Sequence, residues 1–204
     1  MVQREQCTWR APMPGQGGAT PAVWGDSMFV TSADGDDLVL FVSTLATVPS
    51  RWRRTVTSGN QDACRRRQLG SPSPSTDGQH VWVFFSTGVL ACYDFQGEEQ
   101  WKFDVGEPLR EDRHSIRHGI HAVVGRQLSL STTDPRCAGQ GDDTRSGQVI
   151  KLDKLSGETV WVQERITQAG FECKQSYASP VLYDDGQQRF VIAHGAGLHD
   201  RPLA

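Results

Sequence analysis

The sequence predicts an all-β protein that repeats one small antiparallel sheet along its length. The first observation is the stretch 71–103, SPSPSTDGQHVWVFFSTGVLACYDFQGEEQWKF, in which short β-rich runs alternate with tight turns. The second is that parts of this pattern recur before and after it. The third is composition, because 21 Gly and 10 Pro among 204 residues favour a turn-rich β fold over a helical one.

The net charge and the cysteines exclude several classes of function. A net charge of −3 gives no support for binding nucleic acid or a membrane surface. No apolar run reaches the roughly 18 residues of a membrane-spanning helix, and the start, MVQREQCTW, lacks the apolar region of a secretory signal. The five cysteines are odd in number and lack Cys-x-x-Cys spacing, so we predict neither a disulfide framework nor a zinc site.

The first part of the chain predicts one hairpin. Residues 1–19 are polar and rich in Gly and Pro, and we expect them to form a separate N-terminal segment. Strands are predicted over 27–31 and 38–43, joined by a turn over 33–37. Three carboxylates in this turn could bind calcium, but the sequence lacks the Gly and Glu of an EF-hand loop, and a solvated turn is favoured. They are Asp34, Asp36 and Asp37. Residues 57–70 are expected to be irregular.

The central stretch predicts three strands in a meander. They cover 80–85, 89–93 and 99–103, and each is preceded by a turn that contains Gly. Further along, strands are predicted over 147–153 and 158–162, and then over 178–186 and 189–194.

One motif occurs twice with nearly the same spacing. A strand ends in Asp, a Gly turn follows, and a Trp lies four residues beyond the Gly. The residues are Asp94, Gly97 and Trp101 in the first occurrence, and Asp153, Gly157 and Trp161 in the second. Strand alternation points both Trp side chains in the same direction, and we expect both to be largely buried at equivalent places.

Repeats of about 40–50 residues, each a small antiparallel sheet, are typical of a β-propeller. We therefore predict a β-propeller of four-stranded antiparallel blades over 20–204, present as an incomplete arc of about four blades. Openings that contain Pro divide this arc. The approximate blades are 20–56, 57–105, 106–165 and 166–204.

The openings TPAVWGD, SPSPSTDG and SPVLYDDG and the closings YDFQGEEQW and LDKLSGETVW resemble the PQQ-like β-propeller repeat family. That family includes quinoprotein dehydrogenases and non-enzymatic relatives such as BamB, and PGQGGATPAVWGD resembles secreted propeller proteins of planctomycete-type bacteria. The resemblance covers about three quarters of the chain. It implies that the motif Gly makes the turn and that the motif Trp docks between neighbouring blades.

The resemblance breaks at 45–51, 64–70, 109–137 and 197–204, which are rich in Arg. A basic loop for an acidic partner is one interpretation. We favour another, that these segments are translated out of frame. With suitable synonymous codons, residues 126–136 read one base later give GNFLYLQLIHG, a sequence that contains a strand. The preceding residues, read in the same way, give a repeat opening near position 122. We therefore expect 109–137 to be the least regular part of the chain, without native blade strands. Three histidines in it are not taken as metal ligands. They are His114, His118 and His121.

The sequence carries no catalytic signature that we can place. It has no pair of adjacent cysteines, no Gly-x-Ser-x-Gly, no His-Glu-x-x-His and no phosphate-binding loop. His194 lies at a predicted strand end, where propellers place binding residues, but a structural His is favoured. We assign no catalytic, metal or cofactor-binding residue.

We therefore expect a non-catalytic propeller that acts as an extracytoplasmic scaffold or binding module. Its expected partner is another protein or a cell-envelope component, and the intact family member is expected to be periplasmic or secreted. The alternative is a fragment of a PQQ-dependent dehydrogenase, which would require PQQ and calcium. A defective gene product without independent function overlaps the first interpretation.

Overall fold

The computed structural model describes residue 13 and residues 15–44, 50–58, 73–85, 87–104, 121–124, 128–132, 145–166 and 181–192. For 121–124, 128–132, 145–148 and 164–166 only the backbone is described. Every regular element within these ranges is a β-strand, which confirms the predicted all-β class. The described ranges therefore hold no helix that could span a membrane.

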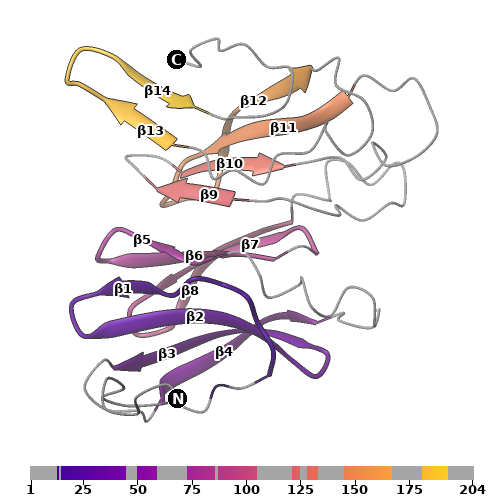
Figure 1. Cartoon of the computed structure of the whole chain (residues 1–204), viewed down its shortest axis with the longest axis vertical. Coiled ribbons are helices and arrows are strands. Elements are labelled where there is room, and N and C mark those ends of the chain that lie inside the picture. Colours follow the sequence, from indigo (N-terminus) through magenta and orange to yellow (C-terminus); the bar gives the residue numbers. More distant parts are fainter. Residues whose placement is uncertain are drawn as a thin grey trace, which may run out of the picture.

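Four antiparallel sheets follow one another along the chain and lie in a stack (Figure 1). The first contains β1 (Ala22–Trp24), β2 (Ser27–Asp34), β3 (Asp37–Thr44) and β4 (Ser50–Ser58). The second contains β5 (Ser75–Thr76), β6 (His80–Phe84), β7 (Val89–Asp94) and β8 (Glu99–Asp104). The third contains β9 (His121–Val124), β10 (Leu128–Thr132), β11 (Arg145–Leu152) and β12 (Thr159–Ile166). The fourth contains β13 (Val181–Asp184) and β14 (Arg189–Ile192).

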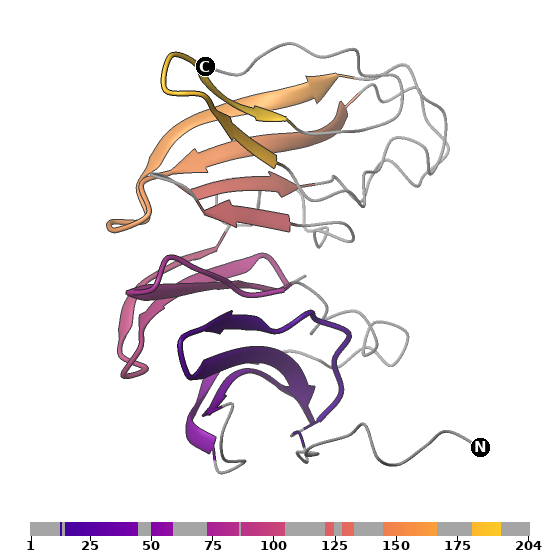
Figure 2. The same ribbon diagram turned by 60° about the vertical axis from the view of Figure 1, so that its left-hand side comes forward.

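Within each sheet the strands pair in sequence order, as the meander predicts. Figure 2 shows the four sheets fanned out one above the other, which is the incomplete propeller arc predicted from the repeats. Three of the sheets are four-stranded blades, and the last is a hairpin in the described residues.

The turn between β2 and β3 shows how the predicted hairpin closes. Asp34 pairs with Asp37, so only two residues lie between the strands, and Gly35 takes a φ of +63°. Asp34 forms an ion pair with Arg53 at 2.9 Å, and Asp37 accepts a hydrogen bond from the Ser58 hydroxyl at 3.2 Å. These two carboxylates are thus engaged by β4 of their own sheet.

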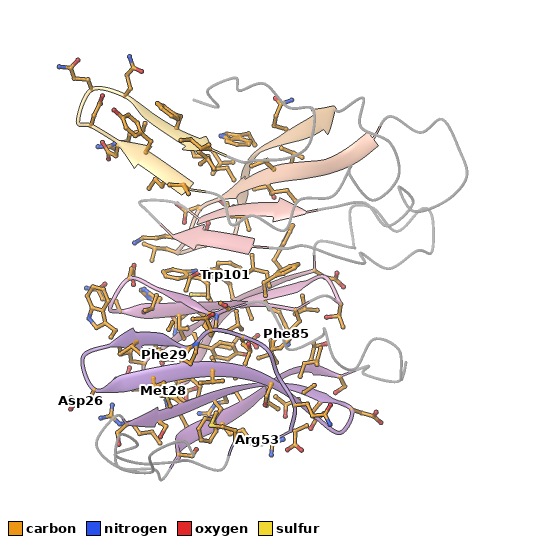
Figure 3. All side chains as sticks on the ribbon, in the orientation of Figure 1. Asp26, Met28, Phe29, Arg53, Phe85 and Trp101 are labelled. Carbon is orange, nitrogen blue, oxygen red and sulfur yellow. The ribbon has the colours of Figure 1, made fainter. Side chains whose placement is uncertain are left out.

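The second sheet is buried on both faces, which explains its nearly continuous apolar runs. Toward the first sheet it presents Val81, Val83 and Phe85, which pack with residues such as Phe29 and Leu40 in one cluster. Figure 3 shows Phe29 and Phe85 in this layer. The side chains that alternate with them point the opposite way, because successive residues of a strand face opposite sides.

The opposite face of the second sheet packs on the third. Trp82, Phe84, Leu90 and Cys92 form a second cluster there with residues of β11. The partners on β11 are Ile150 and Leu152, which are at most 4% exposed. Each apolar layer therefore lies between two sheets, and a sheet alone could not bury it.

Two predictions about the strands are wrong. β4 continues through Thr57 and Ser58, because it pairs along the whole length of β3. Within 109–137, β9 and β10 are strands in register with each other and with β11, where we expected none. Leu128 and Leu130 alternate with Ser, so the sequence as written does keep a period of two there. The remaining residues of 109–137 lie outside the described ranges.

Candidate functional site at the junctions between sheets

The Asp94 turn joins β7 to β8 and is closed by its own side chain. Asp94 Oδ1 accepts hydrogen bonds from the backbone N–H groups of Gln96 and Glu98, both at 2.9 Å. Gly97 ends the turn with a φ of +84°, a conformation that L side chains rarely adopt. The carboxylate is therefore occupied by local backbone donors, as in an Asx-turn.

The Asp153 turn joins β11 to β12 and repeats this arrangement. Asp153 Oδ1 accepts hydrogen bonds from the N–H groups of Leu155 and Ser156, both at 2.9 Å. These backbone hydrogen bonds, that of Ser156 first and that of Leu155 second, hold the pKa of Asp153 below its usual value. Gly157 takes a φ of +76°. The turn is one residue longer than that at Asp94, and the role of the carboxylate is the same.

The first and second sheets meet where Trp52 of β4 lies against Gly97. A Cβ placed on Gly97 would come within 2.8 Å of the Trp52 ring. Trp52 Nε1 donates a hydrogen bond to the carbonyl of Phe95 at 2.9 Å. Arg54, two residues beyond Trp52, donates to the carbonyl of Gly97 at 2.7 Å. The Gly turn of the second sheet thus binds the Trp and Arg side chains on the outer strand of the first sheet.

The second and third sheets meet in the same way. Trp101 of β8 lies against Gly157, where an added Cβ would come within 2.7 Å of its ring. Trp101 Nε1 donates to the carbonyl of Lys154 at 3.0 Å. Phe95 and Lys154 each directly follow the motif Asp, so the two junctions use equivalent backbone atoms. Figure 3 shows Trp101 between the second and third sheets.

Lys154 adds a side-chain contact to the second junction. Its Nζ lies 2.5 Å from Asp77 Oδ2 and 5.8 Å from the centre of the Trp82 ring. Trp82 Nε1 also donates to the Lys154 carbonyl, at 3.2 Å. Burial by itself raises the pKa of Asp77, but the hydrogen bonds from Lys154, His80 and Gln79 outweigh it and hold that pKa below its usual value.

Trp161 of β12 differs from the two docked Trp side chains. Its Nε1 is buried, yet it has no hydrogen-bond partner among the described residues. Lys151 Nζ lies 5.8 Å from the centre of its ring. Trp101 and Trp161 each lie on the outermost strand of their sheet and are partly buried, with the smaller part of each residue exposed.

Two titratable side chains next to these junctions, Cys92 and Tyr93, have raised pKa values. Burial first, and then the charges of Asp77 and Asp94, raise the pKa of Cys92 to about 12. Burial first, and then Glu99, raise the pKa of Tyr93. At neutral pH the Cys92 side chain is therefore a thiol, whereas a nucleophilic cysteine requires a thiolate.

The described residues do not fit a metal-dependent quinone site. They contain no group of three or more His, Cys, Asp and Glu side chains placed to hold a metal ion. The paired cysteines expected of the alcohol-oxidising enzymes have no counterpart in the sequence. His194 and His114 lie outside the described ranges, and only the backbone of His121 is considered.

Sequence reasoning missed Trp52, which holds the same place in the first sheet as Trp101 does in the second. Trp52 pairs with Val42 and Trp101 with Cys92, each two residues before the end of its inner strand. Val48 stands four residues before Trp52, where the motif requires Gly, so the motif was not visible. The spacing of 49 residues between the two Trp could have revealed it.

Residues 46–198 match the family model described as "Outer membrane protein assembly factor BamB". This match covers about three quarters of the chain. The chain belongs to this PQQ-like, BamB-type family. Among curated proteins no significant match was found.

Two solved dehydrogenase structures share the fold of this chain, and a third structure is a weaker match. The europium-containing methanol dehydrogenase aligns with a TM-score of 0.54 and 18% identity, over 74% of this chain and 25% of that one. The quinohemoprotein alcohol dehydrogenase from Comamonas testosteroni aligns with a TM-score of 0.54 and 19% identity, over 76% and 22%. BamB from Moraxella catarrhalis aligns with a TM-score of 0.40 and 15% identity, over 90% and 63%. This chain spans about a quarter of the length of the two dehydrogenases.

Proposed function

We propose that this PQQ-like chain acts without catalysis, as a scaffold or binding module that holds another polypeptide outside the cytoplasm. The observation that carries the proposal is that its repeated residues meet between sheets. Trp52 with Gly97, and Trp101 with Gly157, join one blade to the next. A fold built from such junctions presents a rigid surface, and rigid surfaces favour binding because little entropy is lost.

The family match supports the same proposal. Its description names an outer membrane protein assembly factor. By extension, we place the chain in the periplasm or outside the cell, with a protein or cell-envelope component as its partner. Fold alone does not supply chemistry, so the likeness to dehydrogenases carries no catalytic role by itself.

The alternative is a fragment of a PQQ-dependent dehydrogenase, since two alcohol-oxidising enzymes share the fold of this chain. Titration with PQQ and calcium, followed by the absorbance of the bound quinone and by dye reduction with an alcohol, separates the two functions. The scaffold function predicts neither a bound quinone nor alcohol-dependent dye reduction. Stoichiometric quinone binding with dye reduction would establish the alternative.

A further inference from the structure

The outermost strands of the first three sheets differ at one equivalent position, the residue that follows the Trp. That residue is Arg53 in β4, Lys102 in β8 and Val162 in β12. Arg53 forms an ion pair with Asp34 at 2.9 Å, and Lys102 forms one with Glu99 at 3.7 Å. Val162 is uncharged and 50% exposed. Charged side chains on an edge strand hinder the addition of a further strand, so this protection is present in β4 and β8 and missing from β12.

A second position shows the same contrast. In each of the three strands one residue is inserted just before the Trp by an irregularity in the pairing. The inserted residue is Arg51 in β4, Gln100 in β8 and Val160 in β12. Val160 is 48% exposed. The edge of β12 therefore presents two half-exposed Val side chains where the other two edges present polar or charged ones.

Further sheets of the arc do not cover this edge. In the described ranges β12 pairs with β11 alone, and no strand of one sheet pairs with a strand of the next. Val162 pairs with Ile150 and shares its face, which packs on the second sheet. The fourth sheet stacks on the other side of the third (Figure 2). A longer arc would therefore add sheets on the side away from Val162.

A second copy of the chain matches this edge poorly. Antiparallel pairing of two β12 strands that sets Val160 opposite Val162 also sets Glu158 opposite Glu164. Parallel pairing in register sets each of these Glu residues beside its own counterpart. Like charges directly opposite each other destabilise a sheet. The edge is therefore better matched by a strand of different sequence.

We propose that the edge of β12 at residues 159–162 is a docking site for an extended strand of a partner polypeptide. The strand adds to β12 by backbone hydrogen bonds, and its alternate side chains provide specificity. Apolar residues of the partner lie opposite Val160 and Val162. Basic residues lie opposite Glu158 and Glu164, because opposite charges on paired strands stabilise a sheet. The inference rests on the proposed binding function and names the surface and the chemistry of the partner.

The test uses the full chain and a fluorescent peptide of sequence KTVTVTK as the probe. This peptide carries basic ends and two Val residues two positions apart, as the edge requires. Fluorescence anisotropy measures its affinity, and hydrogen exchange of the backbone amides locates its binding site. We expect a dissociation constant of about 0.1 mM and slower exchange of the amides of residues 159–162 in the presence of the peptide.

Three controls make the result specific. Val162→Lys gives β12 the residue that β8 has at the same place, and it should weaken binding about tenfold or more. Lys102→Gln changes the equivalent position of β8 and should leave the affinity unchanged. The peptide KTVPVTK should not bind, because Pro has no N–H to donate and is excluded from a paired strand. This peptide tests the proposal on the unaltered chain, whether or not the Val162 variant folds.

Several results would overturn the proposal. These are no binding at about 1 mM peptide, equal affinity for the wild type and Val162→Lys, or protection of amides outside β12. Slower exchange of residues 159–162 in the chain alone as its concentration rises would show that a second copy fills the edge, and would also overturn it. Quinone binding and dye reduction play no part in these readouts, so a failure here is distinct from a failure of the scaffold function.

Discussion

The two junctions between sheets differ at one equivalent place. The junction between the first and second sheets has apolar side chains there, and the junction between the second and third has charged ones. Phe29 and Trp82 occupy equivalent positions, paired with Val42 and Cys92. At the first junction the ring of Phe95 packs on Phe29, with centroids 4.8 Å apart. At the second, the Lys154 ammonium lies over Trp82 and pairs with Asp77.

The backbone part of the two junctions is the same despite this difference. In each, an indole N–H reaches the carbonyl that follows the motif Asp, and a Gly lies against the ring. A contact between an indole and a turn backbone depends on the turn geometry and not on the side chain of the turn. The neighbouring side chains are therefore free to vary, provided that a charge receives a partner.

The largest expected effect is that of a side chain at the turn Gly. Gly157→Val should destabilise the chain by about 4 kcal/mol, because it combines a strained φ with a clash against Trp101. Gly35→Val provides the control, since Gly35 has a similar φ of +63° but open space around it. Its cost should be only that of the backbone strain, about 1–2 kcal/mol. Urea denaturation measures both, and equal costs would contradict the docked geometry.

The next effect compares the two docked Trp residues with Trp161, whose N–H has no acceptor among the described residues. Trp52→Ala and Trp101→Ala should each cost about 3 kcal/mol, since each removes packing and a hydrogen bond between sheets. Trp161→Ala should cost about 1 kcal/mol, because its N–H has no acceptor among the described residues. Thermal or urea unfolding of the three variants gives the comparison. A loss at Trp161 as large as that at Trp101 would remove the distinction.

A smaller effect separates the charged junction from the apolar one by its pH dependence. The pKa of Asp77 in the folded chain lies below the ordinary value of 3.8, so its contribution is complete above pH 4 and is lost as the pH falls through the folded pKa. Asp77→Asn should cost about 1 kcal/mol at pH 7. It should also reduce the loss of stability between pH 4 and pH 2. An unchanged acid limb in this variant would show that Asp77 and Lys154 are not coupled.

The smallest effect concerns the thiol between the second and third sheets. In a chain whose other four cysteines are replaced by Ser, Cys92 should resist a disulfide reagent at pH 8. Burial blocks access, and a pKa of about 12 leaves little thiolate. When urea is added, the rate of Cys92 modification should rise with the fraction of unfolded chain. Rapid modification of the folded chain would mean that the second junction opens.

The regular blades could be predicted from the sequence because several independent sequence signals indicate the same strands and turns. Strand runs such as 80–85, Gly turns and the Asp-to-Trp spacing all indicate the same sheet. The junction partners could not be predicted, since contacts such as that between Trp101 and Lys154 join residues 53 positions apart. Trp52 was missed because Val48 replaces the Gly of its turn.

The irregular segments show the limit of reading a local pattern. β9 and β10 form between segments rich in Arg and His, and their register is fixed because β9 pairs with β10 and β10 pairs with β11. Ser129 and Ser131 hold the places taken by Trp82 and Phe84 in the second sheet. Translation one base later would put an apolar Leu at both positions, as the second sheet has apolar residues there. The out-of-frame hypothesis therefore stays a prediction, and resequencing the locus tests it.

The most direct test of the account is a double-mutant cycle between Trp101 and Gly157. If the indole lies against Gly157, the cost of Gly157→Val should fall by about 1.5 kcal/mol or more when Trp101 is already Ala, because the clash has been removed. The free energies of unfolding of the wild type, both single variants and the double variant give this coupling. Additive costs, within about 0.5 kcal/mol, would contradict the claim that one sheet is joined to the next through the Trp–Gly contact.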